Sequence, residues 1–238
     1  MSNYSGYEDW KQWEKDSFGK CDAVTAVYFA AELARGGIKN CEGRRFFELG
    51  FGNGAFAGYV RDRGGEYVGS EVNAGLVERA VNSGIKAFEG GVTQALREIG
   101  PASFDVFVAF DVLEHLDVTA IQSLVADVKL LLKPGGIFLA RVPSGDSPFG
   151  RAIFHGDLTH LTALGSSAVR QLAAQSGFDV IEIGSPKLPL RGVGFRRALR
   201  RAAIVFAQKI IGSLINLIYH EGQPRVITPN LVFVLRKK

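Results

Sequence analysis

The sequence predicts an α/β fold with a mostly parallel sheet, and three observations support this. Short apolar runs alternate with helix-like segments along residues 45–184, which is the pattern of strands joined by crossover helices. The run 104–110 is almost wholly apolar, as expected for a strand that is buried on both faces. Another apolar run, 46–49, leads directly into the glycine-rich stretch 50–54, which indicates a tight turn at the end of a strand.

The N-terminal segment, residues 1–44, reads as a helical cover. Trp10, Trp13 and Phe18 are spaced for one helix face, and a second helix over 24–35 stops at a glycine pair. We expect these aromatic side chains to pack against the domain, with stacking on a ligand as the alternative.

The remaining elements are predicted from their apolar runs and their stop signals. A helix ends within 131–136, where proline and glycine follow it. Residues 143–165 read as a polar loop, and a short helix is expected over 167–175. Strands are predicted over 46–49, 66–72, 85–89, 104–110, 137–142, 178–183 and 230–236.

These elements divide the chain into four segments. The helical cover 1–44 precedes a core over 45–184, and residues 185–229 form an insertion before the final strand of the core, 230–238. The chain has 238 residues and is 47% hydrophobic, which is enough to build one full core with an appendage.

Composition favours a cytoplasmic protein. Only two cysteines occur, Cys21 and Cys41, without metal-ligand spacing, so a disulfide framework is not expected. The N-terminus lacks the basic and apolar regions of a signal peptide. No uninterrupted apolar run reaches the length of a membrane span.

Charge is distributed unevenly along the chain. Residues 185–238 hold eleven Lys or Arg and one acid, whereas the first 184 residues hold 17 basic and 23 acidic residues. The positive charge of the protein therefore resides almost wholly in its C-terminal segment.

The insertion contains a predicted basic amphipathic helix over 195–219. Basic side chains lie off its apolar face, which is formed by Phe195, Leu199, Ala202, Phe206, Ile210 and Leu217. Such a helix can lie on an anionic membrane surface, here the inner face of the membrane. The alternatives are that the apolar face packs on the core or on a second subunit of a homo-oligomer.

An acid ends each of the first two strands. Glu48 lies two residues before Gly50, and the glycine spacing G-x-G-x-G differs from the G-x-G-x-x-G of a dinucleotide site. A carboxylate at that position repels phosphate but attracts a cationic ligand. Glu71, about twenty residues later, stands where an acid bonds the ribose hydroxyls in α/β nucleoside sites.

This ordered set, together with the stretch 111–116 after the fourth strand, resembles class I S-adenosylmethionine-dependent methyltransferases. The resemblance implies a Rossmann-like sheet of seven strands, with the last strand antiparallel beside the sixth. It also implies that S-adenosyl-L-methionine is the cofactor. The expected cofactor-binding residues are Glu48, Gly50, Gly52, Gly54, Glu71, Val72, Phe110 and Asp111.

Two strings over residues 141–150 and 156–163 resemble a narrower subgroup, the methyltransferases of bacterial surface-polysaccharide biosynthesis. They are Arg-x-Pro-x-Gly-Asp-Ser-Pro-Phe-Gly from Arg141 and Gly-Asp-x-Thr-His-x-Thr-Ala from Gly156. This resemblance implies O-methylation of a sugar hydroxyl on a nucleotide-sugar or a lipid-linked glycan.

Three histidines are expected near the edge of the sheet where the acceptor approaches. They are His115, His155 and His160. An alcohol acceptor must lose its proton, and a neutral imidazole suits that task. We assign the proton acceptor to His160, with Asp157 as its orienting carboxylate, and His115 is the rival. No metal ligands are assigned.

Other readings remain open. A small-molecule methyltransferase acting on a quinone, lipid or secondary metabolite is the main alternative, and a non-catalytic cofactor-binding module is a third. A nucleic-acid substrate is disfavoured, because residues 111–114 read Asp-Val-Leu-Glu and lack the Asn/Asp-Pro-Pro-aromatic motif that resembling enzymes use to hold a base.

Overall fold

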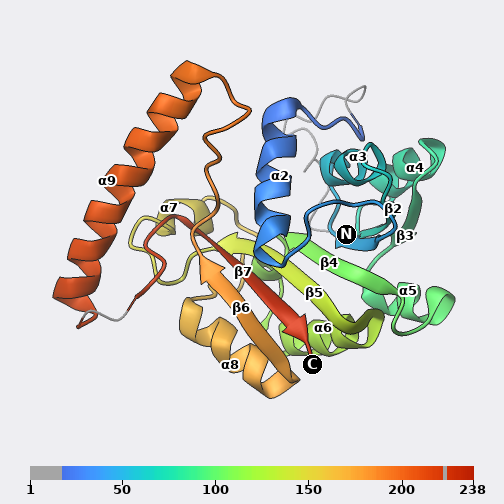
Figure 1. Cartoon of the computed structure of the whole chain (residues 1–238). Helices are drawn as coiled ribbons and strands as arrows, with labels where there is room; N and C mark the ends of the chain where they lie inside the picture. Colours follow the sequence, from blue (N-terminus) through green and yellow to red (C-terminus); the bar gives the residue numbers. More distant parts are fainter. Residues whose placement is uncertain (1–17, 222–223) are drawn as a thin grey trace.

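The computed structural model describes residues 18–221 and 224–238, and a seven-stranded sheet lies at its centre (Figure 1). The strand order is β3-β2-β1-β4-β5-β7-β6. The first five strands pair in parallel, and β7 lies antiparallel between β5 and β6. The predicted sheet is therefore confirmed. The strands are β1 (Arg45–Leu49), β2 (Glu66–Glu71), β3 (Lys86–Glu89), β4 (Phe104–Phe110), β5 (Leu132–Pro143), β6 (Phe178–Gly184) and β7 (Asn230–Lys237).

Helices cover both faces of the sheet, because alternate strand residues point to opposite faces. Phe46 packs with helices α2, α3 and α4 on one face, and Phe47 packs with α5, α6 and α8 on the other. The helices are α2 (Ala23–Arg35), α3 (Ala55–Arg61), α4 (Ala74–Asn82), α5 (Val92–Ile99), α6 (Val118–Leu131), α7 (Arg151–Phe154), α8 (Ser166–Ser176), α9 (Phe195–Tyr219) and the short 3-10 turn η2 (Leu113–His115).

The strand order of the sheet predicts a crevice at the carboxyl ends of β1 and β4. The chain runs outward from β1 to β2 and β3, then crosses back to β4 on the other side of β1. Where the strand order reverses in this way, the helices after neighbouring strands diverge, and ligands bind beside the carboxyl ends of the strands.

The structure differs from the prediction at β5, which begins at Leu132 and not at residue 137. Leu132 is fully buried and pairs with Phe104, beyond an irregularity in the ladder. Lys133 holds this start in place, since its Nζ lies 2.9 Å from the Asp105 carboxylate. The predicted loop after β5 also differs, because it contains α7 and a parallel bridge between Ser144 and Leu164.

The helix predicted over 24–35 is present as α2. Asp22 caps it, with its side chain accepting hydrogen bonds from the backbone N–H groups of Val24 and Thr25. Phe18 packs edge-to-face against Phe51 of the glycine-rich turn, at 6.1 Å between ring centroids. Trp10 and Trp13 lie outside the described residues, so their expected packing stays a prediction.

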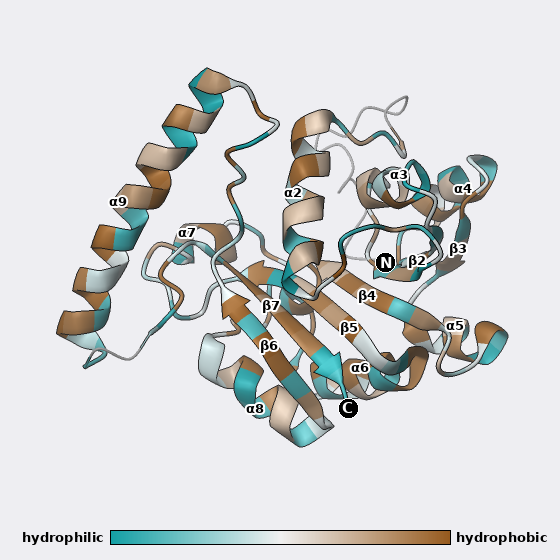
Figure 2. Ribbon diagram, viewed as in Figure 1, coloured by the Kyte–Doolittle hydropathy of each residue, from teal (hydrophilic) through white to brown (hydrophobic). Residues whose placement is uncertain are grey.

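Helix α9 stands apart from the sheet (Figure 1), and brown apolar bands recur along it (Figure 2). None of its residues is buried. The alternative that its apolar face packs on the core is therefore not what the structure has. By length and composition α9 could also cross a membrane, although polar residues interrupt its apolar run. Lys209 is its one charged residue after position 201, so the helix combines enough length with few charges.

Candidate active site

A cavity of about 890 Å³ opens at the carboxyl ends of β1, β2, β3 and β4. Seven of the eight predicted cofactor residues line it: Glu48, Gly50, Gly52, Glu71, Val72, Phe110 and Asp111. Gly54 does not line it and instead caps the start of α3 with a left-handed backbone, φ +74°. The volume lies in the upper part of the range for small-molecule sites, so the cavity can hold a nucleoside-sized ligand and part of a second molecule.

The glycine-rich turn requires glycine for two physical reasons. Gly50 and Gly52 adopt φ of +71° and +53°, which other residues adopt only with strain. A Cβ atom on Gly50 would also lie 2.5 Å from Cγ2 of Val112. The turn can therefore pass close to the residues that follow β4.

Glu71 connects the end of β2 to this turn. One carboxylate oxygen accepts a hydrogen bond from the Gly52 N–H at 3.2 Å. The other accepts from the N–H groups of Val72 at 2.7 Å and Asn73 at 3.2 Å. Its carboxylate is thereby fixed at the cavity wall, with lone pairs available to hydroxyl groups of a ligand.

Glu48 is a buried acid in the cavity wall. It is 4% exposed, and its carboxylate accepts a hydrogen bond from the Tyr67 hydroxyl at 2.5 Å. Burial raises the pKa of Glu48 to about 8, and the nearby charge of Glu71 also raises it. A cation bound in the cavity would favour the ionised form of this buried carboxyl.

This shift predicts a pH-dependent stability. An unfolded chain ionises Glu48 near its ordinary pKa of 4.5, whereas the folded chain keeps the proton until about pH 8. Folding therefore becomes less favourable as pH rises between these values, by up to about 1.4 kcal/mol per pH unit. In thermal unfolding of the ligand-free protein, the melting temperature of Glu48→Gln minus that of the wild type should increase as pH rises from 5 to 9. The same difference at both pH values would contradict this, and exposed Glu66→Gln is the control.

The ion pair of Asp111 and Arg141 lines the cavity at the ends of β4 and β5. Asp111 has a left-handed backbone, φ +56°, and its carboxylate accepts two hydrogen bonds from the Arg141 guanidinium, one of them at 2.9 Å from Nε. Arg141 also donates to the Tyr28 hydroxyl at 3.1 Å. Burial lowers the pKa of Arg141, but the hydrogen bonds and charge of Asp111 outweigh it and raise the pKa overall. Burial raises the pKa of Tyr28 to about 12.

The stretch 111–116 after β4 and the string 156–163 meet beside this cavity. The backbone carbonyl of Glu114 accepts hydrogen bonds from the N–H groups of Leu161 at 2.7 Å and Thr162 at 3.1 Å. The Thr162 hydroxyl donates to the Leu116 carbonyl at 2.6 Å. These bonds dock the loop after α7 onto η2, so that Thr159 and His160 lie against His115.

The hydrogen bonds determine which nitrogen of His115 carries its proton. Hydrogen bonds from Thr159 and the charges of the two histidines outweigh burial and lower the pKa of Asp157, so its ionised carboxylate only accepts. The Thr159 hydroxyl donates to Asp157 at 2.5 Å. Its oxygen must then accept from Nδ1 of His115, 2.8 Å away. The lone pair of a neutral His115 is therefore on Nε2, and His115 lines the cavity.

His160 is held differently from the prediction. Its Nδ1 donates to the backbone carbonyl of Phe154 at 2.8 Å. Asp157 lies 3.9 Å from His160 Nε2, too far for a hydrogen bond. Asp157 thus does not form the expected hydrogen bond with His160 and keeps only this longer contact. It hydrogen-bonds Thr159, which bonds His115, because the turn 157–159 directs its carboxylate there. His160 is not among the cavity-lining residues.

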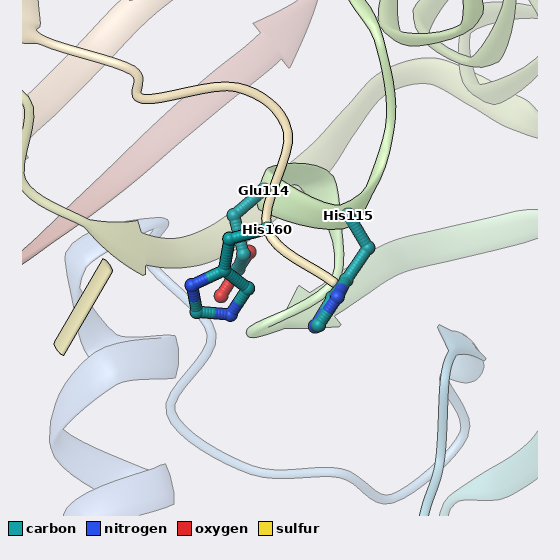
Figure 3. Close-up of side chains that lie close together, drawn as sticks. All are labelled: Glu114, His115 and His160. Atoms are coloured by element: carbon teal, nitrogen blue, oxygen red, sulfur yellow. The ribbon is translucent and has the colours of Figure 1, made fainter. Parts of the chain in front are cut away.

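Figure 3 shows Glu114, His115 and His160 gathered at this point. Potential ligand atoms of these three residues lie within 4.8 Å of one another, and Glu114 is buried. The imidazole rings of the two histidines are 4.6 Å apart between centroids. These three residues could hold a metal ion. The sequence did not predict the cluster, because His160 lies 46 residues after Glu114.

Sequence reasoning missed several cavity-lining residues. Gly91 and Val92 follow β3, and the general rule that ligands bind at strand ends could have indicated them. Tyr28 on α2 and Lys187 and Arg201 of the insertion carried no local signal, because they approach the cavity only through tertiary packing.

Comparison with known proteins agrees with this geometry. Residues 47–140 match the model of a methyltransferase domain. No curated protein matches the chain. A S-adenosylmethionine-dependent methyltransferase from Archaeoglobus fulgidus has a similar structure, with a TM-score of 0.64 and 17% identity, over 99% of this chain and 100% of that chain.

Two further solved structures show the same fold. A S-adenosylmethionine-dependent methyltransferase from Mesorhizobium loti matches with a TM-score of 0.58 and 16% identity, over 89% of this chain and 98% of that chain. A TehB-like methyltransferase from Corynebacterium glutamicum matches with a TM-score of 0.58 and 13% identity, over 99% of this chain and 100% of that chain.

The chain thus has the fold of these S-adenosylmethionine-dependent methyltransferases, and residues 47–140 match a methyltransferase domain. The chain is an enzyme, a methyltransferase that uses S-adenosylmethionine. This disfavours the reading as a non-catalytic module.

Proposed function

We propose that the enzyme O-methylates a sugar hydroxyl of a nucleotide-sugar or lipid-linked glycan in surface-polysaccharide biosynthesis. The observation that carries this proposal is the chain from Asp157 through Thr159 to His115, which leaves a lone pair on Nε2 of a cavity-lining imidazole. An alcohol needs such a base, whereas an acceptor that is already an anion does not. The reaction is placed in the cytoplasm.

The cavity residues fit the cofactor by charge and shape. Glu71 is assigned to the ribose hydroxyls and Glu48 to the cationic end, with the glycine-rich turn allowing close backbone approach. S-adenosylmethionine supplies, when bound, a methyl group on a positively charged sulfur. The protein's part is to hold the acceptor oxygen in line with that methyl group, at about 3 Å.

His115 is the proposed proton acceptor, in preference to His160. Nε2 of His115 takes the hydroxyl proton while the acceptor oxygen forms its bond to the methyl carbon. The resulting imidazolium is stabilised by Thr159 and the ionised Asp157, as in other acid–histidine arrangements. The ring of His160 packs on His115 and does not line the cavity, so we assign His160 to the positioning of His115.

The cationic residues of the cavity support an anionic acceptor. Arg141, Lys187 and Arg201 line the cavity, and guanidinium and ammonium groups are common partners of phosphate oxygens. Both a nucleotide-sugar and a diphosphate-linked glycan carry such oxygens.

Methyl transfer to defined acceptors tests this function. The purified enzyme and S-adenosylmethionine would be incubated with nucleotide-sugars, with polyprenyl-diphosphate glycans, or with phenolic quinone precursors, and products followed by mass spectrometry. A methyl group on a sugar oxygen is the expected product. Methylation confined to the quinone precursors would overturn the glycan assignment and favour the small-molecule alternative, which Phe29 and Phe110 in the cavity wall also allow.

A further inference from the structure

Helix α9 presents a large apolar surface without a partner among the described residues. Phe195, Leu199, Phe206, Ile210 and Leu217 recur at spacings of four and seven, so they share one face. They are 47–82% exposed. A flanking face of the helix is half-buried against the protein, with Ala198, Val205 and Asn216. The apolar face therefore points outward, and monomeric soluble proteins rarely leave such a patch uncovered.

Polar contacts fix the first end of the insertion. The side chains of Glu32 and Arg35 on α2 are buried and form an ion pair with each other. Arg35 also bonds Glu182 and the Ser185 carbonyl, and Glu32 accepts from the Lys187 N–H at 2.5 Å.

The helix itself is tied to both legs of the insertion. Arg201 donates to the Pro189 carbonyl at 2.7 Å. On the return leg, the Asn216 side chain accepts from the Arg225 N–H at 3.1 Å, and Ser144 donates to the Val226 carbonyl at 2.7 Å. Because both ends are held, the exposure of the apolar face is a property of this fold.

Charge identifies the surface that covers this face. Arg196, Arg197 and Arg200 are exposed on the first turns, and α9 contains no acidic residue. A second copy of α9 would offer no carboxylate to these arginines. A bilayer with anionic headgroups offers phosphates to the arginines and acyl chains to the apolar face.

The insertion also forms part of the active-site wall. Pro186, Lys187, Leu188 and Arg201 line the same cavity as Gly50 and Glu71. The segment that carries the exposed helix thus contributes the cationic side chains of Lys187 and Arg201 to the cavity wall. A surface that receives α9 is therefore brought next to a segment that lines the cavity.

We propose that α9 docks the enzyme on an anionic membrane surface, from which the cavity takes a lipid-linked, phosphate-bearing acceptor. The identity of the acceptor rests on the proposed function, whereas the docking does not. We assign the phosphate groups to Lys187, whose Nζ also bonds Glu182 at 3.2 Å, and to Arg201.

Vesicle sedimentation of the full chain tests the docking. The protein should sediment with vesicles of phosphatidylcholine and phosphatidylglycerol at low salt, but not with phosphatidylcholine alone, and high salt should release it. Phe206→Ser with Ile210→Ser and Leu217→Ser should lower the partition coefficient by about 100-fold or more. Arg196→Gln with Arg197→Gln and Arg200→Gln should lower it by about 100-fold.

A matched control changes apolar residues that are equally exposed elsewhere. Val81→Ser with Val118→Ser and Leu130→Ser, at residues 54–59% exposed on α4 and α6, should leave vesicle binding unchanged. Absence of binding to anionic vesicles, or equal loss in the control, would overturn the docking. A dimer in light scattering that the α9 serine variant dissociates would also overturn the docking, because a second copy would then cover the helix. Retention in the vesicle pellet after high-salt washing would overturn it as well, because the helix would then cross the bilayer.

Activity separates this proposal from the proposed function. Methyl transfer to a water-soluble glycan acceptor should be unchanged in the α9 variants, while transfer to a vesicle-borne acceptor should fall with vesicle binding. Equal rates on the vesicle-borne acceptor with and without docking would refute delivery from the membrane. Vesicle binding without any sugar methylation would refute the proposed function and leave the docking intact.

Discussion

Replacing His115 by glutamine is expected to lower the turnover number by roughly 10²–10⁴-fold, the usual contribution of a general base. The imidazole lines the cavity and its Nδ1 donates to Thr159, so the proposed function assigns the hydroxyl proton to Nε2. Glutamine keeps polar contacts but cannot take up a proton. Cofactor affinity, measured by calorimetry, should change little, and the acidic limb of the pH–rate profile should disappear.

Two further variants examine the positioning of His115. Thr159→Val removes the link to Asp157 and should lower turnover less than His115→Gln, with a shifted pH profile. His160→Ala removes the ring that packs on His115 and should also cost less. The exposed His155 is the matched control, and His155→Gln should behave as the wild type.

The assignment of His115 as the base would be overturned if His160→Ala lowered turnover more than His115→Gln. If His160→Ala abolished turnover while His115→Gln stayed within a few-fold of the wild type, His160 would be the base, as the sequence alone indicated. Loss of activity on dialysis against a chelator, restored by a divalent cation, would instead assign Glu114, His115 and His160 to a metal ion.

Replacing Glu71 by alanine is expected to weaken cofactor binding by about 1.5–3 kcal/mol, which is the value of a hydrogen bond to a charged group. The dissociation constant should rise roughly 10–150-fold. Glu71 lines the cavity and also accepts from the Gly52 N–H, so its loss should remove the proposed contact with the ribose and loosen the turn. Titration calorimetry with S-adenosylmethionine measures the effect.

A neighbouring acid provides the control for Glu71. Glu89 ends β3, lies opposite Glu71 in the ladder and does not line the cavity. Glu89→Ala should leave the affinity unchanged. Wild-type affinity in Glu71→Ala would remove the ribose assignment, and a large fall in melting temperature would show that Glu71 serves mainly to hold the turn.

Much of the fold could be predicted because strand periodicity and stop signals are local. The run 104–110 matches β4, and the glycines of residues 50–54 fall at the carboxyl end of β1. The start of β5 was missed because Pro134 and two glycines locally indicate a break. Burial of Leu132 and the ion pair of Lys133 with Asp105 overcame that tendency.

The sequence by itself determined the order of the strands along the chain, the glycine-rich turn, the acids that end β1 and β2, and the apolar face of α9. Each depends on residues within a few positions of one another. Only the tertiary structure decided that Thr159 orients His115, 44 residues away, and that Arg141 clamps Asp111. It also decided that the apolar face of α9 points away from the core. Sequence periodicity specifies that a helix has an apolar face, but what covers that face depends on how distant segments pack.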